Sequence, residues 1–133
     1  MPNNKSFTLM IVWLPVLACM GFIFYAGSLP GSDVPALFAY QDVVFHLGIY
    51  FLLGLFFLRG LHKTFHGIIP AKSVLVTLLF IIFYGITDEL HQGFTPNRSV
   101  SGFDVFIDSL GGFFGSFIYS APKPWLKLNL FRQ

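Results

Sequence analysis

Hydrophobic residues in this chain form four long stretches, each close in length to a membrane-spanning helix. Crossing a hydrocarbon core of about 30 Å takes about 20 consecutive apolar residues in a helix. Short polar links separate the stretches, and the repeated alternation that builds a closed membrane barrel is absent from the sequence. We therefore expect an all-α fold, an integral membrane bundle of four transmembrane helices. The pattern predicts helices over residues 7–27, 42–61, 71–91 and 102–121.

The composition of the chain supports a lipid environment. Apolar residues make up 55% of it and charged residues only 11%, whereas an average soluble domain has about 25% charged residues. Six acids and eight bases cannot cover the surface of a soluble domain, so lipid must cover most of it. A length of 133 residues suits one domain. We expect a single membrane domain over 1–133, with a basic tail at 122–133.

Charged residues sort by side of the membrane. In a four-helix topology all bases except Arg98 fall on one side, and all acids fall on the other side together with Arg98. Because short loops rich in Lys and Arg stay in the cytoplasm, we expect both termini inside (N-in/C-in) and the acids outside. Topology explains the bases, and no nucleic-acid partner is expected. The bases on the inner side are Lys5, Arg59, Lys63, Lys72, Lys123, Lys127 and Arg132, and the acids are Asp33, Asp42, Asp88, Glu89, Asp104 and Asp108.

Two polar residues are expected below the outer membrane surface. At the rise of an α-helix, His46 lies about 20 Å from Arg59, and Asp108 about 22 Å from Lys123. Both distances are shorter than the apolar thickness of about 30 Å. A charged group at such a depth usually faces a bundle interior or a wet cavity, which makes both residues functional candidates.

The second predicted helix begins with a polar stripe. Asp42, His46 and Tyr50 follow at i, i+4 and i+8 and share one face. We expect Asp42 to accept a hydrogen bond from His46 and so fix the tautomer of the imidazole. A lone His in a membrane helix is more often a structural residue bonded to a neighbouring helix. With the stripe of three residues, a functional site is as well supported as a structural role.

The third predicted helix ends in polar residues on two faces. Glu89 and Gln92 share one face, and Asp88 and His91 share another, so we expect one pair to point inward and the other toward the interface. Acids at a helix C-terminus oppose the helix dipole. Two of them together indicate a partner cation, and Arg98 is the one nearby.

A short non-helical link is predicted between the third and fourth helices, on the outer side, where residues 95–97 are typical of a turn. Asp104 and Asp108 follow at i, i+4 near the start of the fourth helix, where the helix dipole favours anions. Gly111 and Gly115 form a Gly-x-x-x-Gly step, which we assign to close helix packing.

Three helices thus deliver polar groups at one depth on one side, with Arg98 in the connecting link. Such groups are unfavourable in lipid unless they pair with one another. We expect them to surround a polar vestibule that faces outside and admits a polar headgroup. The predicted ligand-binding residues are Asp42, His46, Tyr50, Glu89, Gln92, Arg98, Ser101, Asp104 and Asp108.

This ordered set of residues resembles the VanZ-like family of small bacterial membrane proteins. The resemblance covers residues 28–115 and continues into the last helix at Gly111 and Gly115. The matching motifs are Asp42-x-x-x-His46-x-x-x-Tyr50 and Glu89-Leu-x-Gln92-x-Phe94-x-Pro96-x-Arg98-x-x-Ser101-x-x-Asp104.

The resemblance implies a four-helix protein of the bacterial cytoplasmic membrane. The founding member of the family is linked to low-level resistance to the lipoglycopeptide teicoplanin, and the resemblance supplies no established reaction. The family often has Lys after the Asp of the second helix, where this chain has Val43, and Asn where Asp108 stands. This site is therefore more anionic than the family pattern.

The sequence is compatible with three kinds of function. A recognition protein would bind membrane lipids, a lipid-linked cell-envelope precursor or a lipoglycopeptide, with Arg98 pairing an anionic group. A membrane enzyme acting on an envelope lipid would use Asp42 and His46 as base, with Glu89 and Arg98 as acid and charge stabiliser. An ion pathway is disfavoured because few polar groups continue into the inner halves of the helices. Recognition is the favoured function.

A metal-dependent version of the enzyme would draw on hard ligands. The spacing allows Mg²⁺ or Zn²⁺ but requires neither, so no metal ligand and no cofactor is assigned, and the sequence leaves the oligomeric state open. The residues available to such a site are Asp42, His46, Glu89, Asp104 and Asp108.

Overall fold

A computed structural model describes residues 4–121, and in this part of the chain it contains four long helices and no strand. The all-α prediction is confirmed, and the predicted helix limits differ from the observed ones by three residues or fewer. The predicted basic tail at 122–133 lies outside the described residues. The elements are α1 (Asn4–Gly27), the short 3-10 helix η1 (Gly31–Asp33), α2 (Gln41–Thr64), α3 (Pro70–Gln92) and α4 (Gly102–Ser120).

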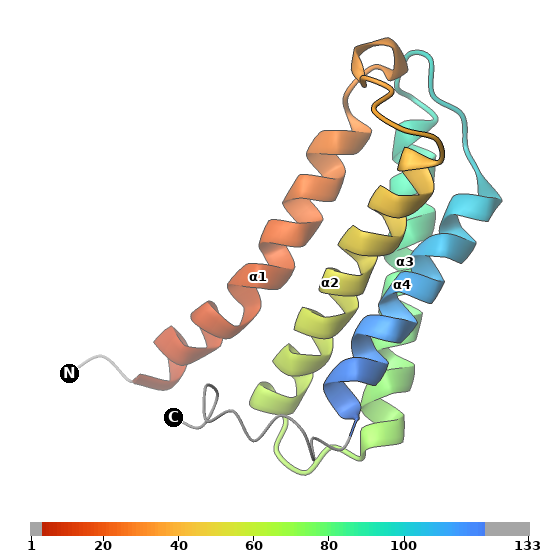
Figure 1. Ribbon diagram of the computed structural model, residues 1–133. Coiled ribbons are helices and arrows are strands. Elements are labelled where there is room, and N and C mark those ends of the chain that lie inside the picture. The colour runs from red at the N-terminus through yellow and green to blue at the C-terminus, as the bar shows by residue number, and fades with distance from the viewer. Residues whose placement is uncertain (1–3, 122–133) are drawn as a thin grey trace.

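The helices run up and down along one another, each reversing direction relative to the one before (Figure 1). The α1–α2 and α3–α4 links lie at one end of the bundle, which we call the site end, and the α2–α3 link lies at the other. Helices α2, α3 and α4 form a compact group. Helix α1 lies beside them and diverges from α2 toward the end opposite the site end.

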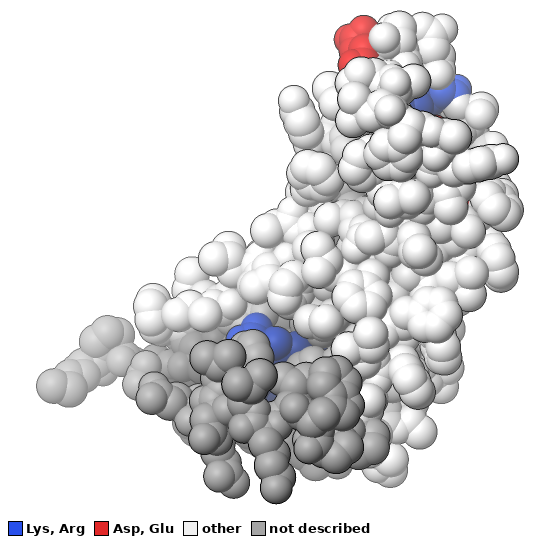
Figure 2. Space-filling view, viewed as in Figure 1, with Lys and Arg blue, Asp and Glu red and all other residues white. Residues whose placement is uncertain are grey.

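Three helices are long and apolar enough to cross a membrane by length and composition, over Leu9–Gly27, Gln41–Thr64 and Pro70–Gln92. Helix α4, predicted as a fourth span, is not among them, because its aspartates, glycines and serines lower its mean hydropathy. In Figure 2 the charged side chains on the visible face lie toward its two ends, with a broad uncharged band between them. Such a band suits contact with lipid.

Glycines set the close approach of α2 and α4. A Cβ atom at Gly111 would lie 2.5 Å from the carbonyl oxygen of Leu47, and one at Gly115 would overlap the carbonyl oxygen of Phe51. Small residues allow this backbone contact between membrane helices. The packing role predicted for these glycines is confirmed, and their contact holds the middle of α4 against the part of α2 that carries His46 and Tyr50.

The apolar core lies beside the polar groups of the site end. Val16, Cys19 and Ile23 of α1 pack there with Leu53 of α2 and Ile81 of α3. Tyr50 belongs to the same cluster, and its side chain is fully buried. Its ring therefore lies in the core while its hydroxyl reaches the polar groups described next.

Candidate functional site

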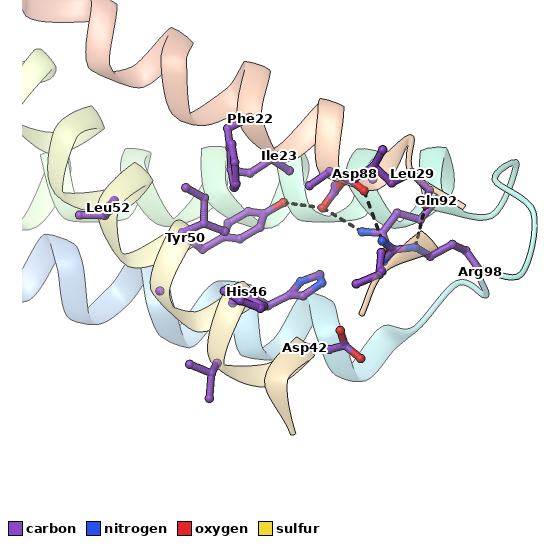
Figure 3. Close-up of a pocket in the computed structure, with 17 residues that line it drawn as sticks. Phe22, Ile23, Leu29, Asp42, His46, Tyr50, Leu52, Asp88, Gln92 and Arg98 are labelled. Carbon is purple, nitrogen blue, oxygen red and sulfur yellow. Dashed lines mark hydrogen bonds between the residues drawn. The ribbon is translucent and has the colours of Figure 1, made fainter. Parts of the chain in front are cut away.

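A cavity of about 410 Å³ lies at the site end, bounded by the last turns of α1, the first half of α2 and the end of α3. Much of the lining is apolar and includes Phe22 and Ile23 of α1 and Phe45, Ile49 and Leu52 of α2. In Figure 3 the side chains of Asp88, Gln92 and Arg98 lie toward one end of the cavity and Leu52 toward the other. The polar residues of the lining are Asp42, His46, Tyr50, Asp88, Gln92 and Arg98.

A run of hydrogen bonds crosses the polar side of the cavity (Figure 3). The Tyr50 hydroxyl donates to Asp88 Oδ2 at 3.3 Å, and the Gln92 amide donates to the same oxygen at 3.2 Å. Arg98 Nη1 in turn donates to Gln92 Oε1 at 3.1 Å. The run links α2 to α3 and α3 to the α3–α4 link, and so fixes the polar groups relative to one another.

His46 pairs with α4 and not with its own helix. Its Nδ1 lies 2.9 Å from Asp108 Oδ1, and Asp108 is fully buried. The predicted hydrogen bond from His46 to Asp42 is therefore wrong, and Asp42 is exposed at the cavity rim. The glycine contact between α2 and α4 brings Asp108 within reach of the imidazole. The ring of His46 is also nearly parallel to that of Tyr50, with centroids 6.4 Å apart.

Arg98 fastens helix α1 to the α3–α4 link. Its Nη2 donates to the carbonyl of Ala26 in the last turn of α1 at 3.2 Å, and its Nε donates to that of Leu29, just after the helix, at 3.3 Å. The prediction that Arg98 pairs with the acids at the end of α3 is wrong. Its partners are two carbonyls and the Gln92 amide oxygen.

Glu89 joins the end of α3 to the start of α4. Its Oε2 accepts a hydrogen bond of 2.7 Å from the backbone amide of Ser101, and its side chain is 1% exposed. Ser101 is the N-cap of α4, and its hydroxyl accepts from the amide of Asp104 at 3.2 Å. Glu89 and Ser101 therefore shape the turn that presents Asp104 and Asp108.

Asp88 is a site residue that the sequence prediction left out. Both acids of α3 are buried, so the expectation that only one polar face of this helix points inward is wrong. Asp88 precedes Gln92 by four residues, so the two side chains share a face of α3. This spacing to a predicted site residue could have identified Asp88 from the sequence. His91, in the last turn of α3, is only partly buried and stacks on Phe24 of α1, with ring centroids 4.3 Å apart.

The predicted residues divide into two groups that meet at His46. Asp42, His46, Tyr50, Gln92 and Arg98 line the cavity, whereas Glu89, Ser101, Asp104 and Asp108 do not. His46 takes part in two clusters in which single ligand atoms lie within 4.8 Å of one another. These clusters, whose atoms are close enough to hold a metal ion, are His46–Asp88–Asp108 and His46–Glu89–Asp104.

Replacing Arg98 with alanine is expected to loosen α1. The change removes three hydrogen bonds and leaves two carbonyls of the α1 end without these partners, so the free energy of unfolding in detergent micelles should fall by about 2–4 kcal/mol. Arg98→Lys should recover less than half of the loss because an ammonium lacks the fork of donors. The exposed Lys63→Ala is the control, and an equal effect of both alanine variants would contradict the role.

The fold and this site define a helical membrane protein with a buried polar cluster beside an amphiphilic cavity. The family model described as VanZ/LLP1 matches residues 10–127, and the chain belongs to this family. Comparison with curated proteins and with solved structures gave no match.

Proposed function

We propose that this protein binds an amphiphile of the cell envelope, a lipid through its headgroup or a lipoglycopeptide, in the cavity between α1 and α2. The observation that carries this proposal is the amphiphilic lining, apolar along much of α1 and α2 and polar where α2, α3 and the α3–α4 link meet. A volume of about 410 Å³ lies in the range of small-molecule sites. It suits the part of a ligand where an apolar chain joins a polar group.

The apolar part of the ligand would lie against Phe22, Phe45 and Leu52. These side chains line the cavity and are still 59%, 54% and 42% exposed. The polar part would meet His46 and Arg98. Arg98 uses three of its five N–H groups within the protein, so the others are free to donate to a phosphate or carboxylate of the ligand.

The same proposal puts the site end at the outer face of the bacterial cytoplasmic membrane. The described bases Arg59, Lys63 and Lys72 lie around the α2–α3 link at the opposite end of the bundle, and short basic loops stay in the cytoplasm. With this orientation the cavity lies in the outer leaflet, where envelope precursors and lipoglycopeptides are found.

Filling the cavity tests the proposal. Gly48 lines the cavity, and a Cβ atom there would meet no other atom within 4 Å, so Gly48→Leu should fold and occupy the space of the ligand. Native mass spectrometry of wild-type protein in mild detergent is expected to show a bound envelope lipid, and its occupancy should fall at least tenfold in Gly48→Leu. Gly21→Leu is the matched control, since Gly21 is equally open but does not line the cavity.

Two results would contradict amphiphile binding. One is the absence of any bound lipid on the wild-type protein when envelope lipid is added, and the other is equal occupancy in both leucine variants. Expression in a sensitive host separates the two ligand sources. Tolerance to a lipidated glycopeptide that exceeds tolerance to an unlipidated one, and that Gly48→Leu removes, assigns the lipoglycopeptide. Lipid binding without such tolerance assigns the envelope lipid.

An enzyme acting on the same lipid is the second candidate. His46 lines the cavity and is oriented by a buried carboxylate at 2.9 Å, an arrangement that suits a general base. The lipid recovered after incubation distinguishes the two functions. A changed mass assigns catalysis, and an unchanged mass assigns binding.

A further inference from the structure

We propose that His46, Asp88 and Asp108 hold a divalent metal ion. Helices α2, α3 and α4 each supply one of these side chains, and one ligand atom from each lies within 4.8 Å of the other two. Ligand atoms on one ion at bonds of about 2.1 Å are about 3–4 Å apart. Small rotations of the three side chains therefore bring them to coordination distance.

An unpartnered buried oxygen points to a bound cation. Asp108 is fully buried, and while its Oδ1 bonds to His46, its Oδ2 has no hydrogen-bond partner among the described residues. Asp88 is 6% exposed, and its Oδ1 also lacks a partner there. Buried carboxylate oxygens almost always have a partner in folded proteins. A metal ion supplies that partner for Asp108.

The unpartnered oxygen of Asp108 faces the helix that carries Asp88. A Cβ atom built at Gly85 of α3 would lie 3.1 Å from Asp108 Oδ2. Gly85 precedes Asp88 by three residues and shares its face of α3. The oxygen therefore lies between α3 and α4, on the side where Asp88 completes the cluster, and the missing side chain of Gly85 leaves room for it.

The charge of the cluster also calls for a cation. Asp88, Glu89, Asp104 and Asp108 gather around His46, and among the described residues His46–Asp108 is the only contact within 4.0 Å between an acidic and a basic side chain. Arg98 forms no ion pair with these acids, since its three bonds go to carbonyl and amide oxygens. Like charges held together in a site of low dielectric need a counter-ion or protons.

The second cluster, His46–Glu89–Asp104, is a weaker candidate. Both oxygens of Glu89 already accept hydrogen bonds, from the Ser101 amide at 2.7 Å and the Gln92 amide at 3.4 Å. We therefore assign the ion to the cluster with the unpartnered oxygen. One imidazole nitrogen with carboxylate oxygens suits Mn²⁺ or Zn²⁺ better than Ca²⁺, which prefers oxygen ligands alone.

Metal binding by the full chain in detergent micelles tests the assignment. The protein is treated with EDTA and then dialysed against MnCl₂ or ZnCl₂ at micromolar concentration, without lipid. We expect one ion per chain by elemental analysis, and for Mn²⁺ a ¹⁴N coupling from the imidazole by pulsed electron paramagnetic resonance. Asp108→Asn should weaken binding about a hundredfold. Asp33→Asn, an acid at the same end but outside the cluster, should leave it unchanged.

Three outcomes overturn the assignment: no ion retained by folded wild-type protein, Mn²⁺ retained without nitrogen coupling, or equal binding by wild-type and folded Asp108→Asn. The first outcome would mean that protons neutralise the cluster. Should Asp108→Asn fail to fold, Asp88→Asn takes its place. The ¹⁴N coupling of Mn²⁺ in the wild-type protein then still shows whether His46 binds the ion. Because lipid is absent throughout, failure of the amphiphile proposal leaves this result unaffected.

Discussion

Replacing Gly115 with alanine is expected to destabilise the helix bundle by about 3 kcal/mol or more. Overpacking of a core typically costs about 1–3 kcal/mol, and a contact with rigid backbone should reach or exceed the upper end of that range. The new Cβ atom would overlap the carbonyl oxygen of Phe51, a backbone atom that moves only if α2 and α4 separate. Separation would also pull Asp108 away from His46. The free energy of unfolding in detergent micelles, measured by titration with a denaturing detergent, gives the effect.

Two other glycines provide controls for this prediction. A Cβ atom at Gly112 would lie 2.7 Å from Cγ1 and 3.1 Å from Cβ of the buried Ile81, so the whole side chain must shift. Gly112→Ala should still cost less than Gly115→Ala, because the atoms in its way belong to a side chain and not to the backbone of a neighbouring helix. Gly21 has no atom within 4 Å of such a Cβ. Gly21→Ala should raise the stability by about 0.5–1 kcal/mol because glycine is unfavourable inside a helix. Equal effects at Gly115 and Gly112 would show that the helices adjust freely.

Removing His46, the partner of Asp108, is expected to lower the free energy of unfolding as much as Gly115→Ala does. His46→Leu removes the imidazole that lies 2.9 Å from the fully buried carboxyl group of Asp108, and the loss of one partner from a buried pair typically costs about 3–5 kcal/mol. Adding Asp108→Asn should restore at least half of that stability, because the buried charge is then gone. The measurement is made in EDTA so that no metal ion replaces the imidazole.

The rescue must be specific to Asp108. Asp33 belongs to η1 at the same end of the bundle and is exposed, so adding Asp33→Asn to His46→Leu should restore nothing. Should Asp108→Asn also fail to restore stability, the pair would contribute through packing of the imidazole and not through charge.

The helices were predictable because their signal is local. Each is a run of apolar residues ended by Pro, Gly or charged groups, and such runs need no knowledge of neighbouring helices. The same holds for Gly111 and Gly115, whose spacing alone indicates close packing. It also holds for the motif residues, since the stripe from His46 to Tyr50 follows from helical spacing within α2.

The pairing of the polar groups was not predictable, because it depends on how the helices lie against one another. Asp42 and His46 share a face of α2, yet the close approach of α4 gives His46 the carboxylate of Asp108. Arg98 lies next to α3 in sequence, yet the end of α1 takes up two of its donors. Both side chains pair with residues that are far away in the sequence, so distance along the chain does not reveal their partners.

The apolar wall of the cavity was equally hidden in the sequence. Phe22 and Phe45 look like ordinary lipid-facing residues of membrane helices, and nothing in their spacing sets them apart. Only the placement of α1 beside α2 makes Phe22 and Phe45 line one cavity together with His46 and Tyr50. A sequence of this composition therefore predicts where polar groups gather but not which apolar residues accompany them.

The exposure of Phe22, Phe45 and Leu52 has a consequence for how occupancy is measured. A molecule already dissolved among acyl chains reaches these side chains by lateral diffusion, without passing through water. The quantity that governs saturation is then its mole fraction in the bilayer. Diluting vesicles at constant composition should leave the bound fraction unchanged, whereas diluting the ligand with additional lipid should lower it.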